Sequence, residues 1–155
     1  MKISSREDIE APIDFVFAQV SDFPALERSA MRRGAEITRA DALETPGPGM
    51  AWETRFDFRG KRRQVKLELI SYDAPNGMRF SATSPLILGD IRVDLVALSR
   101  GRTRMNIEVE IQPRTLSARL LVQSLKLAKG NVTKRFEMRM ASYARDIEDR
   151  YSRQA

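Results

Sequence analysis

The middle of the chain alternates apolar and polar residues in successive segments, as strands with one buried face do. Apolar and charged side chains alternate from Met50 to Arg59, and a turn at Gly60-Lys61 leads into a second alternating run. Three further runs follow, separated by short turns, so we expect five consecutive antiparallel strands. Their predicted inward rows are Trp52, Thr54, Phe56 and Phe58; Val65, Leu67 and Leu69; Met78, Phe80 and Ala82; Ile91, Val93, Leu95 and Ala97; and Met105, Ile107, Val109 and Ile111.

The preceding segment predicts a strand, two short helices and another strand. Residues 3–10 alternate weakly and are interpreted as a first strand, because polar edge strands show the same weak pattern. Apolar residues at helical spacing follow Pro12, and a second short helix is expected after Pro24. A strand at 35–41 precedes a Pro/Gly-rich loop at 44–49, which cannot sustain a ladder.

A long helix is expected at the C-terminal end of the chain. Pro113 ends the last strand, and Thr115 is a plausible cap for one helix running to about Arg150, roughly 50 Å long. Gly130 inside it indicates either a bend or close contact, or a tolerated surface glycine. One apolar face is formed by Leu121, Leu125, Ala128, Val132, Phe136, Met140, Tyr143 and Ile147. Leu116, Leu120 and Leu127 lie on the opposite side, where they meet either a partner or the loops.

This order of elements, together with two short motifs, resembles the START-like (SRPBCC) helix-grip superfamily, which includes Bet v 1-type pollen allergens and polyketide cyclases/dehydrases. Residues 11–23 are similar to its opening motif, and Gly49-Met-Ala-Trp52 is similar to the glycine before its third strand. The resemblance implies one α+β domain over residues 1–155. A curved antiparallel sheet of about six or seven strands would grip the terminal helix, with two short helices after the first strand. Lipids, hormones, quinones or polyketides occupy the cavity in such proteins.

Composition removes several kinds of chemistry. Cysteine and histidine are both absent, which excludes disulfides and Ser/His/Asp or Cys/His catalysis and leaves only oxygen ligands for a metal. Phosphate-loop and dinucleotide fingerprints are absent too, so we expect no metal and no other cofactor. No segment approaches the roughly 20 apolar residues that span a bilayer, and the first residues lack an apolar run. We therefore predict a cytoplasmic protein.

The net charge of +6 favours anionic partners without choosing among them. Basic residues gather at 59–63 and continue along the terminal helix through Lys126, Lys129, Lys134, Arg135 and Arg139. Solvated surface charge explains them, and transient contact with an anionic membrane is a second interpretation. Nucleic acid is disfavoured because no recognised binding module accompanies the charge. The sequence is compatible with a monomer or a dimer.

The predicted ligand is a hydrophobic small molecule, held between sheet and helix. The inward rows carry no pair of acids, because residues such as Glu53, Asp94 and Glu108 alternate with them. We therefore favour noncatalytic binding or transport of a lipid, quinone or polyketide-like molecule. A polyketide cyclase or dehydratase using the same cavity, and a basic module for anionic membranes, remain alternatives, so catalysis is left open. The candidate ligand-binding residues are Trp52, Thr54, Phe56, Phe80, Leu95, Val132, Phe136, Met140 and Tyr143. Ordinary core packing would also explain each of them. Thr54, Ser84 and Tyr143 are the candidates for hydrogen bonding to the ligand.

Overall fold

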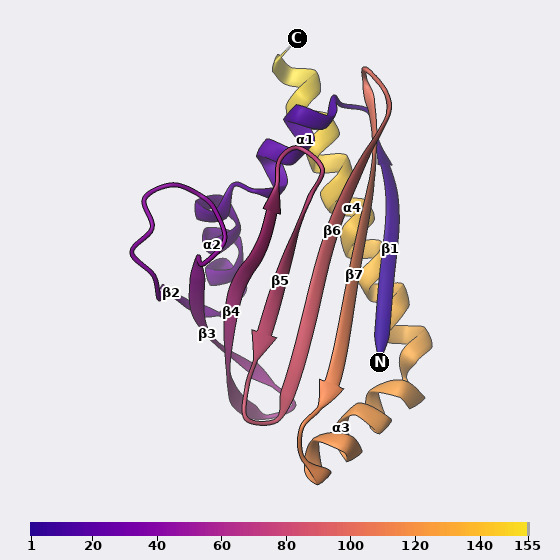
Figure 1. The fold of residues 1–155 in the computed structure, drawn as a ribbon. Helices are drawn as coiled ribbons and strands as arrows, with labels where there is room; N and C mark the ends of the chain where they lie inside the picture. The colour runs from indigo at the N-terminus through magenta and orange to yellow at the C-terminus, as the bar shows by residue number, and fades with distance from the viewer. Residues whose placement is uncertain (155) are drawn as a thin grey trace.

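Seven antiparallel strands form one sheet in the order β1-β7-β6-β5-β4-β3-β2 in the computed structural model, which describes residues 1–154 (Figure 1). Each strand from β3 to β7 pairs with its sequence neighbour, because short turns connect them. The N-terminal strand closes the other edge by pairing with β7. The strands are β1 (Lys2–Ile9), β2 (Glu36–Arg39), β3 (Ala51–Phe58), β4 (Lys61–Asp73), β5 (Gly77–Thr83), β6 (Ile87–Ser99) and β7 (Arg102–Pro113).

The register of the sheet brings the predicted inward rows onto one face. Trp52 lies opposite Leu67, which in turn lies opposite Ala82. Ile91 of β6 lies opposite Val109 of β7 in the same way. Because side chains at paired positions share a face, the rows merge into a continuous apolar surface. The expected helix-grip architecture is therefore confirmed, with two short helices after β1 and a long helix at the C-terminal end.

The other face of the sheet is covered by charged side chains that pair with one another. The carboxylate of Asp90 accepts a hydrogen bond of 2.8 Å from Nε of Arg79 on the neighbouring strand. Asp8 accepts one of 2.9 Å from Nε of Arg104, and this contact lowers the pKa of the carboxyl group. Such exposed pairs contribute little stability individually, but they identify this face as the solvated one.

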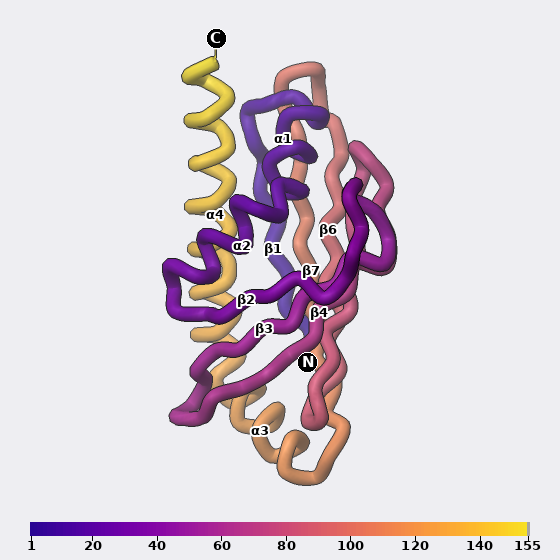
Figure 2. The backbone as a smooth tube through the Cα atoms, turned by 90° about the vertical axis from the view of Figure 1, so that its left-hand side faces the viewer, coloured from indigo at the N-terminus to yellow at the C-terminus, as the bar shows by residue number. Residues whose placement is uncertain are grey.

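Two short helices follow β1 and lie on the apolar side of the sheet. Helix α1 (Ile13–Val20) begins after Pro12, and α2 (Phe23–Arg32) begins after Asp22. The Asp22 carboxylate accepts a hydrogen bond from the backbone N–H of Ala25 at 3.2 Å, which caps the first turn of α2. Figure 2 shows both helices on the same side of the strands as the terminal helix.

The prediction of a single helix from Thr115 to about Arg150 is wrong in one respect, because the chain forms two helices there. Helix α3 (Leu116–Leu127) ends at Leu127 with Ala128 as its C-cap residue, and α4 (Lys129–Gln154) begins immediately after Ala128. The Ala128 N–H bonds to the Leu125 carbonyl at 3.1 Å, three residues back, while the Ala128 carbonyl accepts from Val132 at 3.0 Å. This tight turn redirects the chain, so that α3 contacts β7 and α4 contacts β1.

The two helices consequently bury different faces. Ala118 and Val122 are the buried residues of α3, and Ala144 and Ile147 are those of α4. Gly130 lies in the first turn of α4, and a side chain there would meet open space, so it makes no close contact. Neither helix, nor any other within residues 1–154, combines the length and apolar character that a membrane crossing requires.

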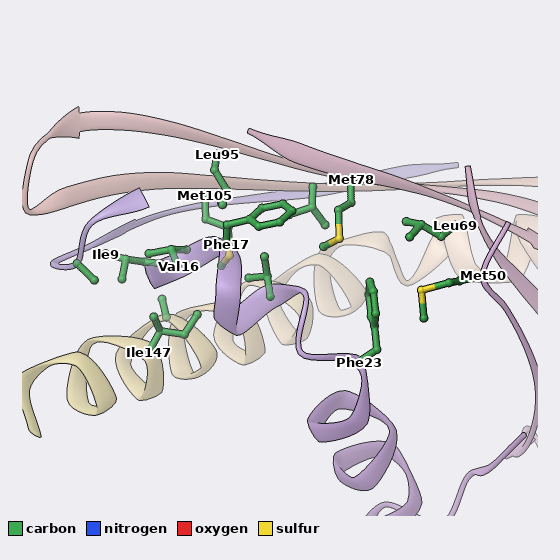
Figure 3. Packing of buried hydrophobic residues seen from close by; sticks show 14 of the residues in the cluster. Ile9, Val16, Phe17, Phe23, Met50, Leu69, Met78, Leu95, Met105 and Ile147 are labelled. Carbon is green, nitrogen blue, oxygen red and sulfur yellow. The ribbon is translucent and has the colours of Figure 1, made fainter. Parts of the chain in front are cut away.

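The packed core includes the space at one end of the molecule where α1 lies between the sheet and α4. Figure 3 shows Val16 and Phe17 of α1 reaching toward the strands, with Ile147 of α4 on the other side. Ile9, Val16 and Ile147 are 0% exposed, so this contact excludes water completely. Burial of these side chains fixes the position of the C-terminal part of α4 over the sheet.

Shortening the Ile147 side chain to alanine should loosen this attachment. We expect Ile147→Ala to lower the free energy of unfolding by about 2–5 kcal/mol, because it removes a fully buried side chain and leaves a cavity. Leu120→Ala is the matched control, since Leu120 is 67% exposed and should change stability by less than about 0.5 kcal/mol. Urea unfolding followed by circular dichroism measures both, and equal losses would contradict the assigned role of Ile147.

Candidate ligand-binding cavity

A cavity of about 750 Å³ lies between the sheet, α2 and α4. Its floor is the apolar face of the adjacent strands β5, β6 and β7, and its opposite wall is the middle of α4. The sheet contributes Met78, Phe80, Ile91, Val93, Ile107 and Val109, and α4 contributes Phe136, Met140, Ser142 and Tyr143. The volume falls within the range of roughly 300–1,000 Å³ typical of small-molecule pockets.

The cavity exists because α1 fills only one end of the space under α4. Toward the C-terminal end, Ala144 and Ile147 of α4 are buried in the core. Toward the N-terminal end, Phe136 and Met140 are only half-buried, and both line the cavity. The apolar face of the sheet is longer than the core that covers it, and the uncovered length becomes the floor of the cavity.

An aromatic cluster forms one end of this floor and also fixes α2 in place. The ring centroid of Trp52 lies 5.3 Å from that of Phe23 and 6.2 Å from that of Phe80. Nε1 of Trp52 donates a hydrogen bond of 2.7 Å to Oε1 of Glu27, so α2 is attached to the sheet by both an aromatic and a polar contact. The opposite side of α2, including Ala25 and residues one turn further on, consequently faces the cavity.

Tyr143 places a phenol at the boundary between the cavity and α1. Its hydroxyl donates a long hydrogen bond of 3.5 Å to the main-chain carbonyl of Gln19. Burial raises the pKa of Tyr143 to about 12, since the phenolate would lose its hydration there. Nearby Arg150 opposes this shift, and the carboxylates of Asp22 and Asp146 add to it. The phenol therefore remains protonated near neutral pH, as a hydrogen-bond donor.

The rim of the cavity is polar and mostly basic. Helix α2 contributes Arg28 and Arg32, the residue after it is Arg33, and α4 contributes Arg139 and Arg150, all of them exposed. Asp22 and Asp146 are the acidic residues that line the same rim. The apolar floor and the basic rim give the cavity two chemically distinct ends.

Four of the nine predicted ligand-binding residues line the cavity, and five lie elsewhere. Phe80, Phe136, Met140 and Tyr143 are at its surface. Trp52 and Leu95 are buried in the core, where Trp52 supports Phe80 from behind. Thr54 is also buried, and its hydroxyl donates to the Val65 carbonyl at 2.8 Å. Phe56 and Val132 are half-buried outside the cavity lining.

The hydrogen-bonding candidate Ser84 is used locally. Its hydroxyl accepts from the backbone N–H groups of Leu86 and Ile87, at 3.2 and 3.0 Å, and so organises the turn between β5 and β6. It does not line the cavity. A polar turn residue of this kind stabilises the backbone without contributing to a ligand site.

Sequence reasoning missed the contribution of α2 to the site. Its cavity side carries Ala25, Arg28, Ser29 and Arg32, which follow helical spacing of three and four residues. The sequence shows this spacing, which predicts that the four residues share one side of a helix. The spacing does not indicate which other part of the structure lies opposite that side. The floor residues Ile91, Val93, Ile107 and Val109 belonged to the predicted inward rows, although only Leu95 was selected from those two strands.

A second hollow, of about 640 Å³, lies beside β1 and β7 and is mainly polar. Glu7 and Glu137 line it, and Glu7 shares the inward face because it lies opposite Met105. Ser5 Oγ in its wall is buried without a hydrogen-bond partner among residues 1–154. Within the same residues, no group of three acidic side chains lies close enough to hold a metal ion.

The pKa of Tyr143 can be measured by alkaline titration of phenolate absorbance. Subtracting the curve of Tyr143→Phe from that of the unmodified protein isolates this residue, whose midpoint should lie near pH 12 instead of its ordinary 10.0. Because the folded-state pKa is the higher one, the folded state retains its proton between these values, and stability falls as the pH rises through them. A midpoint near pH 10 would show that the phenol is hydrated.

Comparisons with solved structures place this geometry among known folds. The protein TTHA0849 from Thermus thermophilus is 14% identical, with a TM-score of 0.66 over 100% of this chain and 99% of its own. The Zhui aromatase/cyclase from Streptomyces sp. R1128 is 13% identical, with a TM-score of 0.64 over 99% and 94%. A START superfamily protein from Mycobacterium smegmatis is 10% identical, with a TM-score of 0.55 over 86% and 95%. At these identities, the likeness concerns the fold alone.

Sequence comparison assigns the family. No curated protein sequence gives a significant match to the chain. The family model described as polyketide cyclase / dehydrase and lipid transport matches residues 1–148, nearly the whole sequence. The same stretch contains every strand and most of α4, the elements that enclose the cavity. The chain therefore belongs to the polyketide cyclase / dehydrase and lipid transport family.

Proposed function

We propose that the protein binds or transports a hydrophobic small molecule in the cavity between the sheet and α4. The observation that carries this proposal is the cavity of about 750 Å³ with an apolar floor on β5, β6 and β7. Removing apolar ligand surface from water contributes roughly 25 cal/mol per Å², so a floor of this kind supplies most of the affinity. Lipids, quinones and polyketide-like molecules all present such surface.

Binding accounts for the site better than catalysis does. A general acid or base works best with a pKa near the operating pH, and the pKa of Tyr143 is raised to about 12. The Tyr143 hydroxyl contacts a main-chain carbonyl, which cannot take up its proton. Asp22 is engaged in capping α2. Cyclase or dehydratase activity would therefore need proton transfer by groups that this arrangement does not activate.

Filling the cavity tests the proposal. Val109→Phe adds an aromatic ring to the floor and should displace an apolar ligand, while Val96→Phe adds the same ring to the solvated face, where Val96 is 51% exposed. We expect native mass spectrometry of gently purified protein to show a bound apolar molecule that persists in Val96→Phe and is lost in Val109→Phe. If the unmodified protein carries no ligand, and a panel of lipids and aromatic molecules produces no thermal shift, the proposal fails.

A second function, transient contact with an anionic membrane, is favoured by the surface of α3. Leu116, Leu120 and Leu127 are 78%, 67% and 92% exposed, and their helical spacing places them on one side of α3. A protein surface seldom presents several large apolar side chains together without a partner. This leucine face of α3 has the geometry of an interfacial helix that lies along a bilayer surface.

The charge around the leucine face matches an anionic surface. Residues 111–136 contain no acidic residue, and their basic residues are Arg114, Arg119, Lys126, Lys129, Lys134 and Arg135. The basic β3–β4 turn lies against the same helix, because Nη1 of Arg59 donates a hydrogen bond of 2.6 Å to Oγ of Ser124. Each basic side chain near an anionic membrane contributes about 1 kcal/mol, and the leucines add apolar contact.

Vesicle sedimentation tests this second function. The protein should bind phosphatidylcholine vesicles containing phosphatidylglycerol, bind pure phosphatidylcholine vesicles weakly, and be released by salt. Replacing Leu116, Leu120 and Leu127 with serine should reduce binding about tenfold or more. Replacing Leu43, Leu88 and Leu98, which are 44%, 43% and 42% exposed elsewhere, should have little effect.

Two results would contradict the membrane function. One is unchanged vesicle binding when the leucine face is replaced by serine. The other is reversible self-association of the unmodified protein, measured by sedimentation velocity, that the same replacement abolishes. The second result would assign the leucine face of α3 to another copy of the chain.

A further inference from the structure

We infer that the ligand carries an anionic group, a carboxylate or a phosphate, which the arginines at the cavity mouth bind while its apolar part lies on the sheet. This inference rests on the proposed binding function and adds a chemical class to the ligand. It follows from the positions of the rim arginines, from their pairing, and from the separation of apolar and basic surfaces within the cavity.

The arginines lie on both sides of the mouth. Arg28 and Arg32 are one helical turn apart on the cavity side of α2, and Arg33 follows at the end of that helix. Arg139 lies on the α4 side, one residue before Met140 of the apolar wall. A planar guanidinium group binds carboxylate or phosphate through paired hydrogen bonds, and arginines on both sides of the mouth can donate such bonds.

These arginines lack the carboxylate partners that Arg79 and Arg104 have. On the solvated face of the sheet, Arg79 and Arg104 contact Asp90 and Asp8 at 2.8 and 2.9 Å. Within residues 1–154, no carboxylate lies within 4.0 Å of the guanidinium groups of Arg28, Arg32, Arg33 or Arg139, and these groups donate no hydrogen bond to another side chain or to the backbone there. Their donors are therefore available to a bound molecule.

The acidic residues of the rim do not neutralise this charge. The Asp22 carboxylate accepts the backbone N–H of Ala25 and so caps α2. Asp146 lies on α4 near Arg150, whose Nη1 donates to Oε1 of Gln19 at 2.8 Å. If the charge of Asp146 is taken to cancel that of Arg150, the remaining rim charges are those of Arg28, Arg32, Arg33 and Arg139 and of the single carboxylate of Asp22. The mouth therefore keeps a net positive charge. The low-dielectric walls of the cavity focus the field of this charge, which attracts an entering anion.

The distribution of surfaces then orients the ligand. Val93, Ile107 and Val109 on the floor offer apolar contact and no side-chain hydrogen bond. The charged groups of the lining come from α4 and from the segment between Asp22 and Arg33, and none comes from the floor strands. An amphiphile that enters with its apolar part first buries that part on the floor and leaves its anionic group beside the arginines.

Matched ligand pairs test the inference. Isothermal titration calorimetry would compare dodecanoate with dodecan-1-ol, and 2-naphthoate with 2-naphthylmethanol, so that each pair shares an apolar part and differs in charge. We expect the anion of at least one pair to bind about tenfold more tightly than its alcohol, the value of one charge-assisted hydrogen bond. Dodecyl phosphate distinguishes a site for phosphate from one for carboxylate.

Two charge-matched triple variants locate the effect. Arg28→Gln/Arg32→Gln/Arg139→Gln removes charge at the mouth and should abolish the preference for the anion while leaving the affinity for the alcohol within about twofold. Arg55→Gln/Arg100→Gln/Arg145→Gln removes the same charge from exposed positions outside the cavity lining and should keep the preference. Circular dichroism verifies that both variants are folded.

The outcomes separate the inference from the proposed function. Equal affinity for anion and alcohol, or an anion preference that both variants lose equally, would overturn the anionic-group inference while the binding function stands. If none of these probes binds, and the purified protein also carries no apolar molecule, the binding function itself is overturned, and the inference with it.

Discussion

The contact on which the structure depends is the insertion of α1 between the sheet and the C-terminal part of α4. Val16 and Phe17 occupy that space, and Ile147 closes it from the helix side. Because α1 is much shorter than the strands, it acts as a spacer at one end only. The apolar face of the sheet continues beyond it, and this uncovered length is the cavity. The same packing that stabilises the fold therefore produces the binding site.

The sheet could be predicted from the sequence because side chains along a strand point alternately to its two faces. Once the face of one residue is assigned, the faces of all the other side chains in that strand follow. The break between α3 and α4 could not. Ala128 is a strong helix former, and the apolar stripe continues through it at helical spacing, so local preference favours one helix. Tertiary contacts decide otherwise, since α3 contacts β7 and α4 contacts β1. Gly130 indicated a possible bend in the helix, but the break lies two residues before it, at Ala128.

The candidate site was predicted in part for a related reason. Periodicity identifies a face that is buried, but it does not distinguish side chains that touch other side chains from those that border empty space. Phe80 and Leu95 occupy equivalent inward positions, yet Phe80 borders the cavity and Leu95 lies in the core. The difference depends on which part of the sheet α1 covers. The basic rim was missed because the sequence does not show that one side of α2 lies across the cavity from α4.

The aromatic cluster beside the cavity has a practical consequence. Trp52 is the only tryptophan of the chain, and it contacts Phe80, whose other side borders the cavity. The indole is also tied to α2 by its hydrogen bond to Glu27. Any occupant that shifts Phe80 or α2 changes the surroundings of this one indole. The intrinsic emission of the protein is thus a built-in optical reporter of cavity occupancy, requiring no added label.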